Sequence, residues 1–260
     1  MYPVLLDFGP VRIFTYGFFL ALAFLSAIYL SGREAGRLGL PVARFYDLCF
    51  YLVLAAVVGS RLLYVLLELP VFLARPLKIF ALWEGGLVFH GGVALALPLA
   101  LYYMARHGLP WRPTLDSLAV GVPVGQFFGR IGCFMAGCCY GSPSHLPWAV
   151  TFTSPETLCP VKEPLHPAQL YEALLALGVF GVIYGIRTRK RFDGQLALVY
   201  FTLAGLVRFV VEFFRHPGDY RGPLLWGGVP LTQALALALA VTCGALLWWW
   251  SRRSQAPPQT

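Results

Sequence analysis

The chain has 260 residues, of which 58% are hydrophobic and only 12% are charged, and its formal net charge is +8. Soluble domains carry about 25% charged residues, so this composition excludes an ordinary soluble domain. The apolar residues come in blocks of about 20, the length that crosses a hydrocarbon core of about 30 Å. The basic residues stand at the ends of these blocks, which is typical of a membrane protein rather than of a nucleic-acid-binding surface.

Taken in chain order, the blocks predict an all-α polytopic membrane protein with seven spans. These are Ile13–Ser31, Asp47–Leu67, Val88–Ala105, Thr114–Gly129, Pro167–Ile186, Gln195–Phe214 and Val229–Trp250. Pro98 and Pro123 are expected to kink their helices. We expect one membrane domain over residues 1–251, with an extracytoplasmic loop at about 141–165 that is long enough to bind or cover a substrate. A polar cytoplasmic tail is expected at 252–260.

The lysines and arginines of the connections predict the orientation. The loops after the first, third and fifth spans, together with the tail, hold eleven of them, against six on the other side. Because cytoplasmic loops carry the excess of Lys and Arg, the N-terminus is expected outside and the C-terminus in the cytoplasm. The N-terminus has no basic region followed by a small-residue cleavage site, so the first apolar block is expected to be retained.

In this orientation, unusual polar side chains converge in the outer half of the membrane, Asp116 and the residues at span termini excepted. At about 1.5 Å per helical residue, Arg61 lies about 20 Å up its span. Arg208 reaches a similar height, with Glu212 one turn above it on the same face. The others, which stand at the outer ends of their spans, are Tyr16, His90, Arg130 and His166.

Three arginines, a glutamate and a histidine at one height predict a site for an anionic substrate at the outer headgroup level. A phospholipid fits, since its phosphate would meet arginine forks while its acyl chains stay in the bilayer. His90 could act as general base, because histidine titrates near neutrality, and the glycines after it would let another helix or a headgroup come close. Structural alternatives stay open: an intrahelical pair of Arg208 with Glu212, an Arg61 that snorkels, and an interfacial hydrogen-bonding His90.

Six short segments carry a resemblance to a known family. They are TYG at Thr15–Gly17, GSRLLYVL at Gly59–Leu66, WEGGLVFHGG at Trp83–Gly92, GRIG at Gly129–Gly132, HPAQLYE at His166–Glu172 and VRFVVEFFRHP at Val207–Pro217. In this order and spacing, over nearly the full length, the chain resembles the prolipoprotein diacylglyceryl transferase family. The resemblance implies a seven-helix inner-membrane enzyme, active at the outer leaflet, that moves the diacylglyceryl group of phosphatidylglycerol onto the lipobox cysteine of a prolipoprotein. A thioether forms, glycerol phosphate leaves, and no cofactor or nucleic-acid partner is expected.

By position in these segments, the resemblance also implies residue roles. Arg130 and Arg208 are predicted to hold the phosphate and stabilise the charge of the leaving group, and His90 to assist deprotonation of the acceptor thiol. The predicted substrate-binding residues are Tyr16, Arg61, Arg130, Gly137, Arg208 and Glu212. Two alternatives are a diverged member that serves another acceptor or thiol redox chemistry through its cysteines, and a non-catalytic phospholipid-binding protein. A transporter is disfavoured, because the chain shows no repeat.

The segment Gly129–Gly141, GRIGCFMAGCCYG, departs from the family pattern. The family typically has Asn-Phe-Ile-Asn-Gly-Glu after GRIG, where this chain has Cys-Phe-Met-Ala-Gly-Cys. Two amides and a carboxylate are thus replaced by two thiols and a methyl group, and Cys cannot supply the paired donor and acceptor of an amide. Cys49 and Cys243, which lie in apolar spans, are expected to be inert core thiols.

Several hypotheses compete for the thiols of this segment. Cys133, Cys138 and Cys139 could pack as small residues in a tight turn, or Cys138 could be a nucleophile or substitute base with a pKa lowered by a nearby arginine. A disulfide among them or with Cys159 fits an oxidising outer face. A soft-metal site that includes His145 is the weakest hypothesis, because C-x4-C-C is no standard zinc spacing. A functional thiol is favoured over the disulfide, and no metal is expected.

Overall fold

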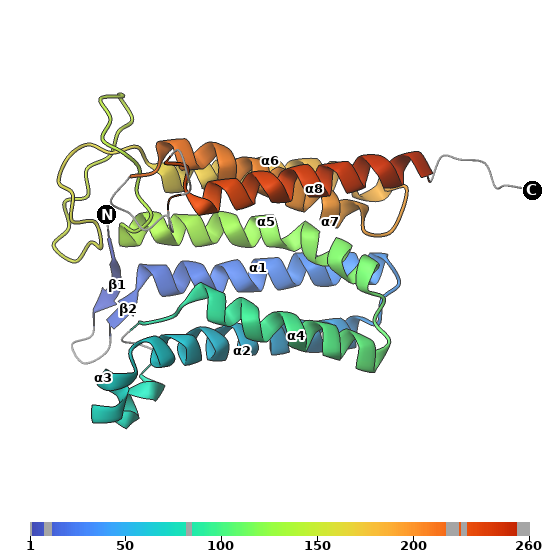
Figure 1. Cartoon of the computed structure of the whole chain (residues 1–260), viewed down its shortest axis with the longest axis horizontal. Coiled ribbons are helices and arrows are strands. Elements are labelled where there is room, and N and C mark those ends of the chain that lie inside the picture. Colours follow the sequence, from blue (N-terminus) through green and yellow to red (C-terminus); the bar gives the residue numbers. More distant parts are fainter. Residues whose placement is uncertain (1, 8–11, 82–84, 217–223, 225–227, 254–260) are drawn as a thin grey trace, which may run out of the picture. The chain divides into compact units, whose positions relative to one another are not determined.

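The structure is a computed structural model that describes residues 2–7, 12–81, 85–216, 224 and 228–253. Helices make up nearly all of the described regular structure (Figure 1). The exception is a two-stranded antiparallel sheet at the start of the chain, formed by β1 (Val4–Asp7) and β2 (Arg12–Phe14). Arg12 lies opposite Asp7 in this sheet, and their side chains form an ion pair of 3.1 Å.

The helices follow the apolar blocks of the sequence. In chain order they are α1 (Thr15–Arg37), α2 (Val42–Leu67), α3 (Leu69–Ala74), η1 (Pro76–Phe80), α4 (Phe89–His107), α5 (Trp111–Ala136), α6 (Ala168–Ile186), η3 (Arg187–Arg189), α7 (Gln195–Val211), η4 (Glu212–Phe214) and α8 (Leu231–Arg253). Each predicted span corresponds to one helix, but α1 and α5 run well past their predicted ends. Both continue to a glycine with positive φ, Gly39 (+73°) or Gly137 (+82°). A span prediction stops where apolar residues stop, whereas a helix continues to its C-terminal signal.

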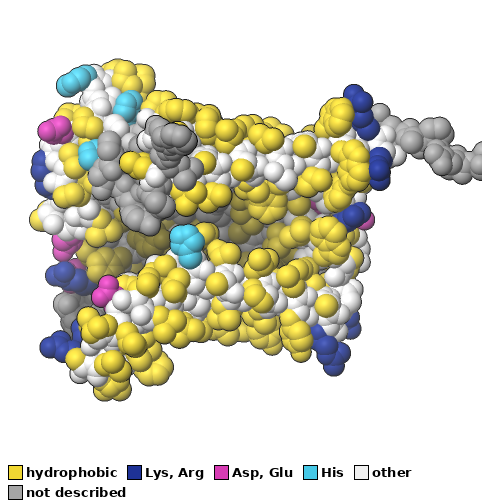
Figure 2. Space-filling view, in the orientation of Figure 1, with side chains coloured by type: hydrophobic (Ala, Val, Ile, Leu, Met, Phe, Trp, Pro, Cys, Tyr) yellow, Lys and Arg dark blue, Asp and Glu magenta, His cyan; other side chains and the backbone are white. Residues whose placement is uncertain are grey.

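Six of the described helices are long and apolar enough to cross a membrane: α1, α2, α5, α6 with η3, α7 with η4, and α8. The predicted seventh span, α4, is not among them, because His90, Gly91 and Gly92 at its start and Arg106 and His107 at its end lower its hydropathy. Large hydrophobic side chains remain exposed along the helices, and Figure 2 shows them covering helix surfaces while Lys and Arg gather near helix ends. Soluble proteins rarely expose so much contiguous apolar surface, so these helices belong in a membrane.

The chain divides into two compact units. The first unit, Met1–Glu34 with Leu115–Thr260, holds most of α1 and α5 and all of α6, α7 and α8. The second unit, Ala35–Thr114, holds α2, α3, η1 and α4. In the first unit, α5, α6 and α7 share a core in which Val120, Ile183 and Leu196 are almost completely buried. The single membrane domain over residues 1–251 stays a prediction, and most of the predicted tail lies outside the described residues.

One end of the first unit is held together by buried carboxylates. Glu34 near the end of α1 pairs with Arg187 at 3.1 Å, and Asp116 in α5 pairs with Lys190 at 2.9 Å. Both carboxylates are 0% exposed. Since an unpaired buried charge is costly, these ion pairs connect α1 and α5 to the segment between α6 and α7.

Asp116 also caps α7. Its two carboxylate oxygens accept hydrogen bonds from the backbone N–H groups of Gly194 and Ala197, at 2.9 and 3.0 Å, where the N-terminus of a helix favours negative charge. Burial alone would lower the pKa of the Lys190 ammonium, but its hydrogen bonds to Asp193 and Asp116 raise that pKa above its ordinary value. Asp116 therefore has a structural role, which explains why it lies apart from the other polar residues at span depth.

In the second unit, α2 and α4 approach each other through glycines and lie side by side (Figure 1). A Cβ atom on Gly59 or on Gly91 would lie within 2.3 Å of the carbonyl oxygen of the other residue. A Cβ atom on Gly92 would lie 2.6 Å from Ser60 Oγ. Only glycine permits so close a contact, so the glycines that follow His90 serve helix packing.

We predict that Asp116→Ala lowers the thermal stability of the detergent-solubilised protein. The substitution removes two backbone hydrogen bonds to a charged group, each worth about 1.5–3 kcal/mol, and leaves Lys190 without its buried partner. The midpoint of thermal unfolding, followed by circular dichroism, should fall clearly. Asp193→Ala is the matched control, because it removes a more exposed carboxylate from the same ammonium. An equal fall in both variants would contradict a capping role for Asp116.

Candidate active site

Four charged side chains form a continuous series in the first unit, and each comes from a different helical element. The Glu172 carboxylate of α6 pairs with Arg130 Nη2 of α5 at 2.7 Å and lies 3.9 Å from Arg208 Nη1 of α7. Arg208 Nη2 pairs in turn with Glu212 of η4 at 2.7 Å. The structure thus brings together the predicted site residues Arg130, Arg208 and Glu212, and it adds Glu172 between them.

The arginines are the accessible members of this series. The side chains of Arg130 and Arg208 are each 25% exposed, whereas those of Glu172 and Glu212 are 14% and 1% exposed. A guanidinium group has five N–H donors, and the carboxylates among the described residues engage only part of them. Two guanidinium groups held by one carboxylate are therefore arranged to bind an oxyanion such as a phosphate.

The site continues toward the cysteine segment. The Arg130 guanidinium interacts electrostatically with three thiols, those of Cys133, Cys138 and Cys139. Tyr16, in the first turn of α1, packs against the same segment, since a Cβ atom on Gly132 would lie 3.3 Å from its ring. The structure therefore places Tyr16 beside the part of α5 that carries Arg130.

The end of α5 differs from the expected turn. Arg130 and Cys133 lie inside the helix, because α5 continues to Ala136. Gly137 ends it with a φ of +82°, and the N–H groups of Gly137 and Cys138 both donate to the Cys133 carbonyl, at 2.9 and 3.2 Å. A Cβ atom on Gly137 would overlap the Thr157 hydroxyl. Gly137 thus has a defined backbone role, and its contact with substrate stays a prediction.

The loop at 141–165 is folded around a small core. The buried residues of this core are Tyr140, Phe152, Cys159 and Leu165. The loop also contacts α6, because Trp148 Nε1 donates to the Tyr171 hydroxyl at 2.8 Å and that hydroxyl lies 3.1 Å from His166 Nδ1. All six cysteines are free thiols, so Cys159 takes no part in the disulfide that the sequence left open.

In the second unit, Arg61 is engaged by the chain's own backbone. Its five N–H donors reach five carbonyl oxygens, those of Lys78, Ile79, Ala81, Gly85 and Gly86. The Tyr64 and Phe72 rings flank the guanidinium at 5.5 and 5.3 Å, and the residue is only 6% exposed. The alternative that Arg61 snorkels is therefore wrong. Its contacts favour a positioning role for the segment before α4, and direct contact with a substrate stays a prediction.

His90 lies in the first turn of α4 and is exposed. The backbone N–H of Val88, just before it, donates to the Ser60 carbonyl at 3.1 Å and ties the start of α4 to α2. A cavity of about 300 Å³ opens near this region, lined by Val57, Val58, Arg61, Leu62, Val65, Ile79 and Phe80. Its lining is apolar apart from the guanidinium, so it is suited to hydrocarbon rather than to a headgroup.

Glu172 and Gln169 are the residues of the site that the sequence did not single out. Both stand in the segment HPAQLYE, three positions apart, and such a spacing places two polar side chains on one face of the otherwise apolar α6. Gln169 is 1% exposed, and its Nε2 donates to the Cys138 carbonyl at 2.7 Å. The sequence therefore contained the pattern of two polar residues on one helix face. It was not recognised as part of the site, because polar residues are common near the end of a predicted span.

Fold and site together define a class of protein: a multi-pass helical membrane protein with a partly buried arginine–carboxylate site suited to an anionic headgroup. Residues 3–250 match the family described as prolipoprotein diacylglyceryl transferase. The chain belongs to this family, as the resemblance of its motifs predicted. The apolar helices and the family together indicate a multi-pass protein of the bacterial inner membrane.

The chain is similar over almost its full length to proteins named phosphatidylglycerol–prolipoprotein diacylglyceryl transferase. That of Pseudomonas fluorescens (strain SBW25) is 36% identical over 262 residues, which cover 97% of this chain and 94% of the relative. Those of Bordetella avium (strain 197N) and Geobacter sulfurreducens are each 37% identical, over 98% of this chain and 97% of each relative.

We predict that Arg61→Lys loosens the segment that Arg61 holds. A lysine ammonium has three donors and no planar fork, so at least two of the five carbonyls lose their partner. Each loss costs about 1–3 kcal/mol if the carbonyl stays buried. Hydrogen–deuterium exchange of residues 76–81 should become faster, whereas the exposed Arg75→Lys should leave it unchanged. Unaltered exchange in Arg61→Lys would contradict the positioning role.

Proposed function

We propose that this protein transfers the diacylglyceryl group of phosphatidylglycerol to a cysteine thiol of a prolipoprotein signal peptide. The observation that carries the proposal is the pair of guanidinium groups, Arg130 and Arg208, held at the single carboxylate Glu172. The names of relatives matched over almost the full length support the same donor and acceptor. That similarity favours the transferase over a non-catalytic phospholipid-binding protein and over a relative with another acceptor.

In the proposed reaction, the acceptor thiolate attacks the carbon of the diacylglyceryl group that is bonded to the phosphate oxygen. A sulfur–carbon bond forms, and the carbon–oxygen bond to the phosphate breaks with its electron pair leaving on glycerol phosphate. Arg130 and Arg208 bind the phosphate and stabilise the charge that develops on it. The thiol proton passes to His90 as general base. Glu172 and Glu212 act as positioning residues, because they orient the two guanidinium groups.

The remaining predicted substrate-binding residues have supporting parts in this proposal. Tyr16 and Gly137 border the segment that carries Arg130, which fits a role in shaping the headgroup site. Arg61 orders the segment before His90, and the apolar cavity beside it is suited to an acyl chain of the lipid. The assignments of Arg61 and His90 rest on the sequence resemblance.

We also propose a seven-span topology, with α4 as the seventh span, the N-terminus outside and the C-terminus in the cytoplasm. The excess of Lys and Arg in alternate loops supports this orientation. It puts the site at the outer leaflet, where signal peptides of exported proteins present their cysteine. The loop at 141–165 would then lie outside the membrane and cover the acceptor peptide.

A transfer assay tests the function directly. Purified protein in mixed micelles with phosphatidylglycerol and a lipobox peptide should add a diacylglyceryl group to the peptide cysteine, detected by mass spectrometry. A peptide with serine in place of that cysteine should stay unmodified. Absence of any addition, with phosphatidylglycerol still bound to the protein, would overturn the proposed function.

We predict that Arg208→Lys lowers kcat by about 10²-fold or more, in the range seen when one donor to a developing oxyanion is lost. Lysine keeps the charge but cannot bind a phosphate through a planar fork. Arg189→Lys, at an exposed position in η3, is the matched control and should transfer lipid at the wild-type rate. Near-normal turnover in Arg208→Lys would exclude a bidentate role for this guanidinium group.

A further inference from the structure

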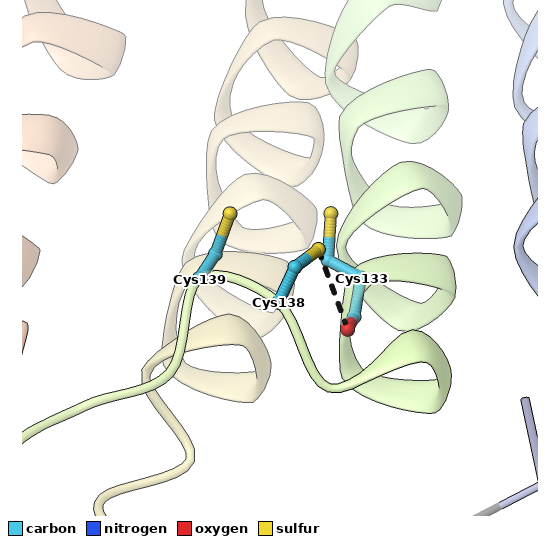
Figure 3. Close-up of side chains that lie close together, drawn as sticks. All are labelled: Cys133, Cys138 and Cys139. Carbon is cyan, nitrogen blue, oxygen red and sulfur yellow. Dashed lines mark hydrogen bonds between the residues drawn. The ribbon is translucent and has the colours of Figure 1, made fainter. Parts of the chain in front are cut away.

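Three thiols that the reaction above does not use lie close together at the end of α5 (Figure 3). The Arg130 guanidinium acts electrostatically on all three. Cys133 belongs to the last turn of α5, and Cys138 and Cys139 follow Gly137, the first residue after that helix. Their Sγ atoms all lie within 4.8 Å of one another, and each residue is half-buried. Among the described residues, this is the one group of three or more His, Cys, Asp or Glu side chains with ligand atoms so close together.

The backbone holds the thiols in place. Cys139 has a φ of +61°, the single positive value among the described non-glycine residues. A non-glycine residue in this left-handed region costs on the order of 1–3 kcal/mol and persists where the surroundings enforce it, often at functional sites. The Cys138 thiol donates to the Cys133 carbonyl at 3.8 Å, and the Cys138 carbonyl accepts from Gln169 at 2.7 Å. The turn is therefore ordered by its own hydrogen bonds.

A buried amide of α6 also contacts this turn. The Gln169 side chain is 1% exposed, and its Oε1 atom has no hydrogen-bond partner among the described residues. Buried acceptors are nearly always satisfied, by protein or by an ordered water. Its Nε2 atom is bonded to the Cys138 carbonyl, so the amide is fixed at this turn and its Oε1 atom can accept one more donor.

The geometry and charge fit a thiophilic metal ion. Sulfur atoms bound to one tetrahedral Zn²⁺ at about 2.3 Å lie about 3.8 Å apart. The three Sγ atoms lie within 4.8 Å of one another. Each pair would therefore move closer by about 1 Å at most to bind the ion. Three thiolates and Zn²⁺ carry a net charge of −1, and both Arg130 and Arg215 act electrostatically on Cys139. Thiolate ligands select soft or borderline ions of this kind over Mg²⁺ or Ca²⁺.

We propose that Cys133, Cys138 and Cys139 bind one Zn²⁺ ion and leave its fourth position for the acceptor cysteine. Three protein ligands with an open position are the pattern of catalytic rather than structural zinc. Binding of the ion releases the three thiol protons to solvent. A substrate thiol that enters the fourth position replaces water and gives its proton to His90, the general base of the proposed reaction, because coordination favours the thiolate. This second step rests on the proposed function, whereas the binding of the ion does not.

The site is tested first by metal content. Full-length protein is purified without a polyhistidine tag from zinc-supplemented cells. It should contain one zinc ion per chain, measured by inductively coupled plasma mass spectrometry. Cys133→Ser, Cys138→Ser and Cys139→Ser should each weaken binding by more than about tenfold, because even loss of an outer-shell partner costs that much. Cys49→Ser and Cys243→Ser, at isolated buried thiols, are matched controls and should keep the ion. Zinc that is absent, or retained in the triple serine variant, overturns the site, as does a native disulfide among the three.

Cobalt substitution tests the open position. Co²⁺ bound to three thiolates should give charge-transfer bands in the ultraviolet and ligand-field bands in the visible region. A lipobox peptide should change these bands, and the same peptide with serine in place of its cysteine should not. Identical spectra with both peptides overturn the assignment of the fourth position.

The transfer assay separates this inference from the proposed function. Chelator-stripped protein should lose transfer, and it should regain transfer when Zn²⁺ is restored. Transfer at the wild-type rate in protein without metal overturns the inference and leaves the proposed function intact. Zinc bound through the three thiols, with no transfer to any lipobox peptide, supports the metal site and overturns the proposed function instead.

Discussion

The Glu172 carboxylate of α6 bridges Arg130 of α5 and Arg208 of α7, and so connects three helices of the first unit at the site. A guanidinium group at membrane depth is costly unless an opposite charge shares its burial. Here one carboxylate serves two guanidinium groups, and Glu212 pairs with the second. Because the four side chains come from α5, α6, α7 and η4, electrostatics and helix packing specify the same arrangement. Loss of the central carboxylate would leave two positive groups facing each other.

The same constraint is met differently where Glu34 and Asp116 lie. Both carboxylates are completely buried, and Asp116 is bonded to a lysine and to two backbone N–H groups. All the hydrogen bonds and the ion pair of Asp116 described above hold parts of the fold together. In the arginine series the carboxylates are also buried, but the guanidinium groups stay partly exposed with donors to spare. A charged side chain whose hydrogen bonds are all made within the protein indicates a structural role. A charged side chain that is held in place but keeps unused N–H donors indicates a binding role.

The sequence predicts the helices well because hydrophobic blocks and helix length follow from the thickness of the membrane. It also predicts that Arg130, Arg208 and Glu212 meet, since rise per residue converts position into height. It fails where a partner is distant in sequence. Nothing local indicates that the Arg61 donors reach carbonyls 17 to 25 residues further on. Likewise, C-x4-C-C spacing does not predict a thiol cluster, because it takes a left-handed Cys139 after the end of α5 to bring the sulfurs together.

Helix α5 connects the two halves of the proposed chemistry. Arg130 and Cys133 stand three positions apart, so their side chains share one face of the helix and are displaced by about 4.5 Å along its axis. An in-line displacement needs the attacking sulfur and the departing phosphate oxygen on opposite sides of one carbon. A metal ion bound through Cys133 and a phosphate bound to Arg130 would both be positioned from this one helix. Helix α6 contacts both places, because Gln169 donates to the Cys138 carbonyl and Glu172 pairs with Arg130. The proposed thiol side and phosphate side of the site are therefore held by the same two helices.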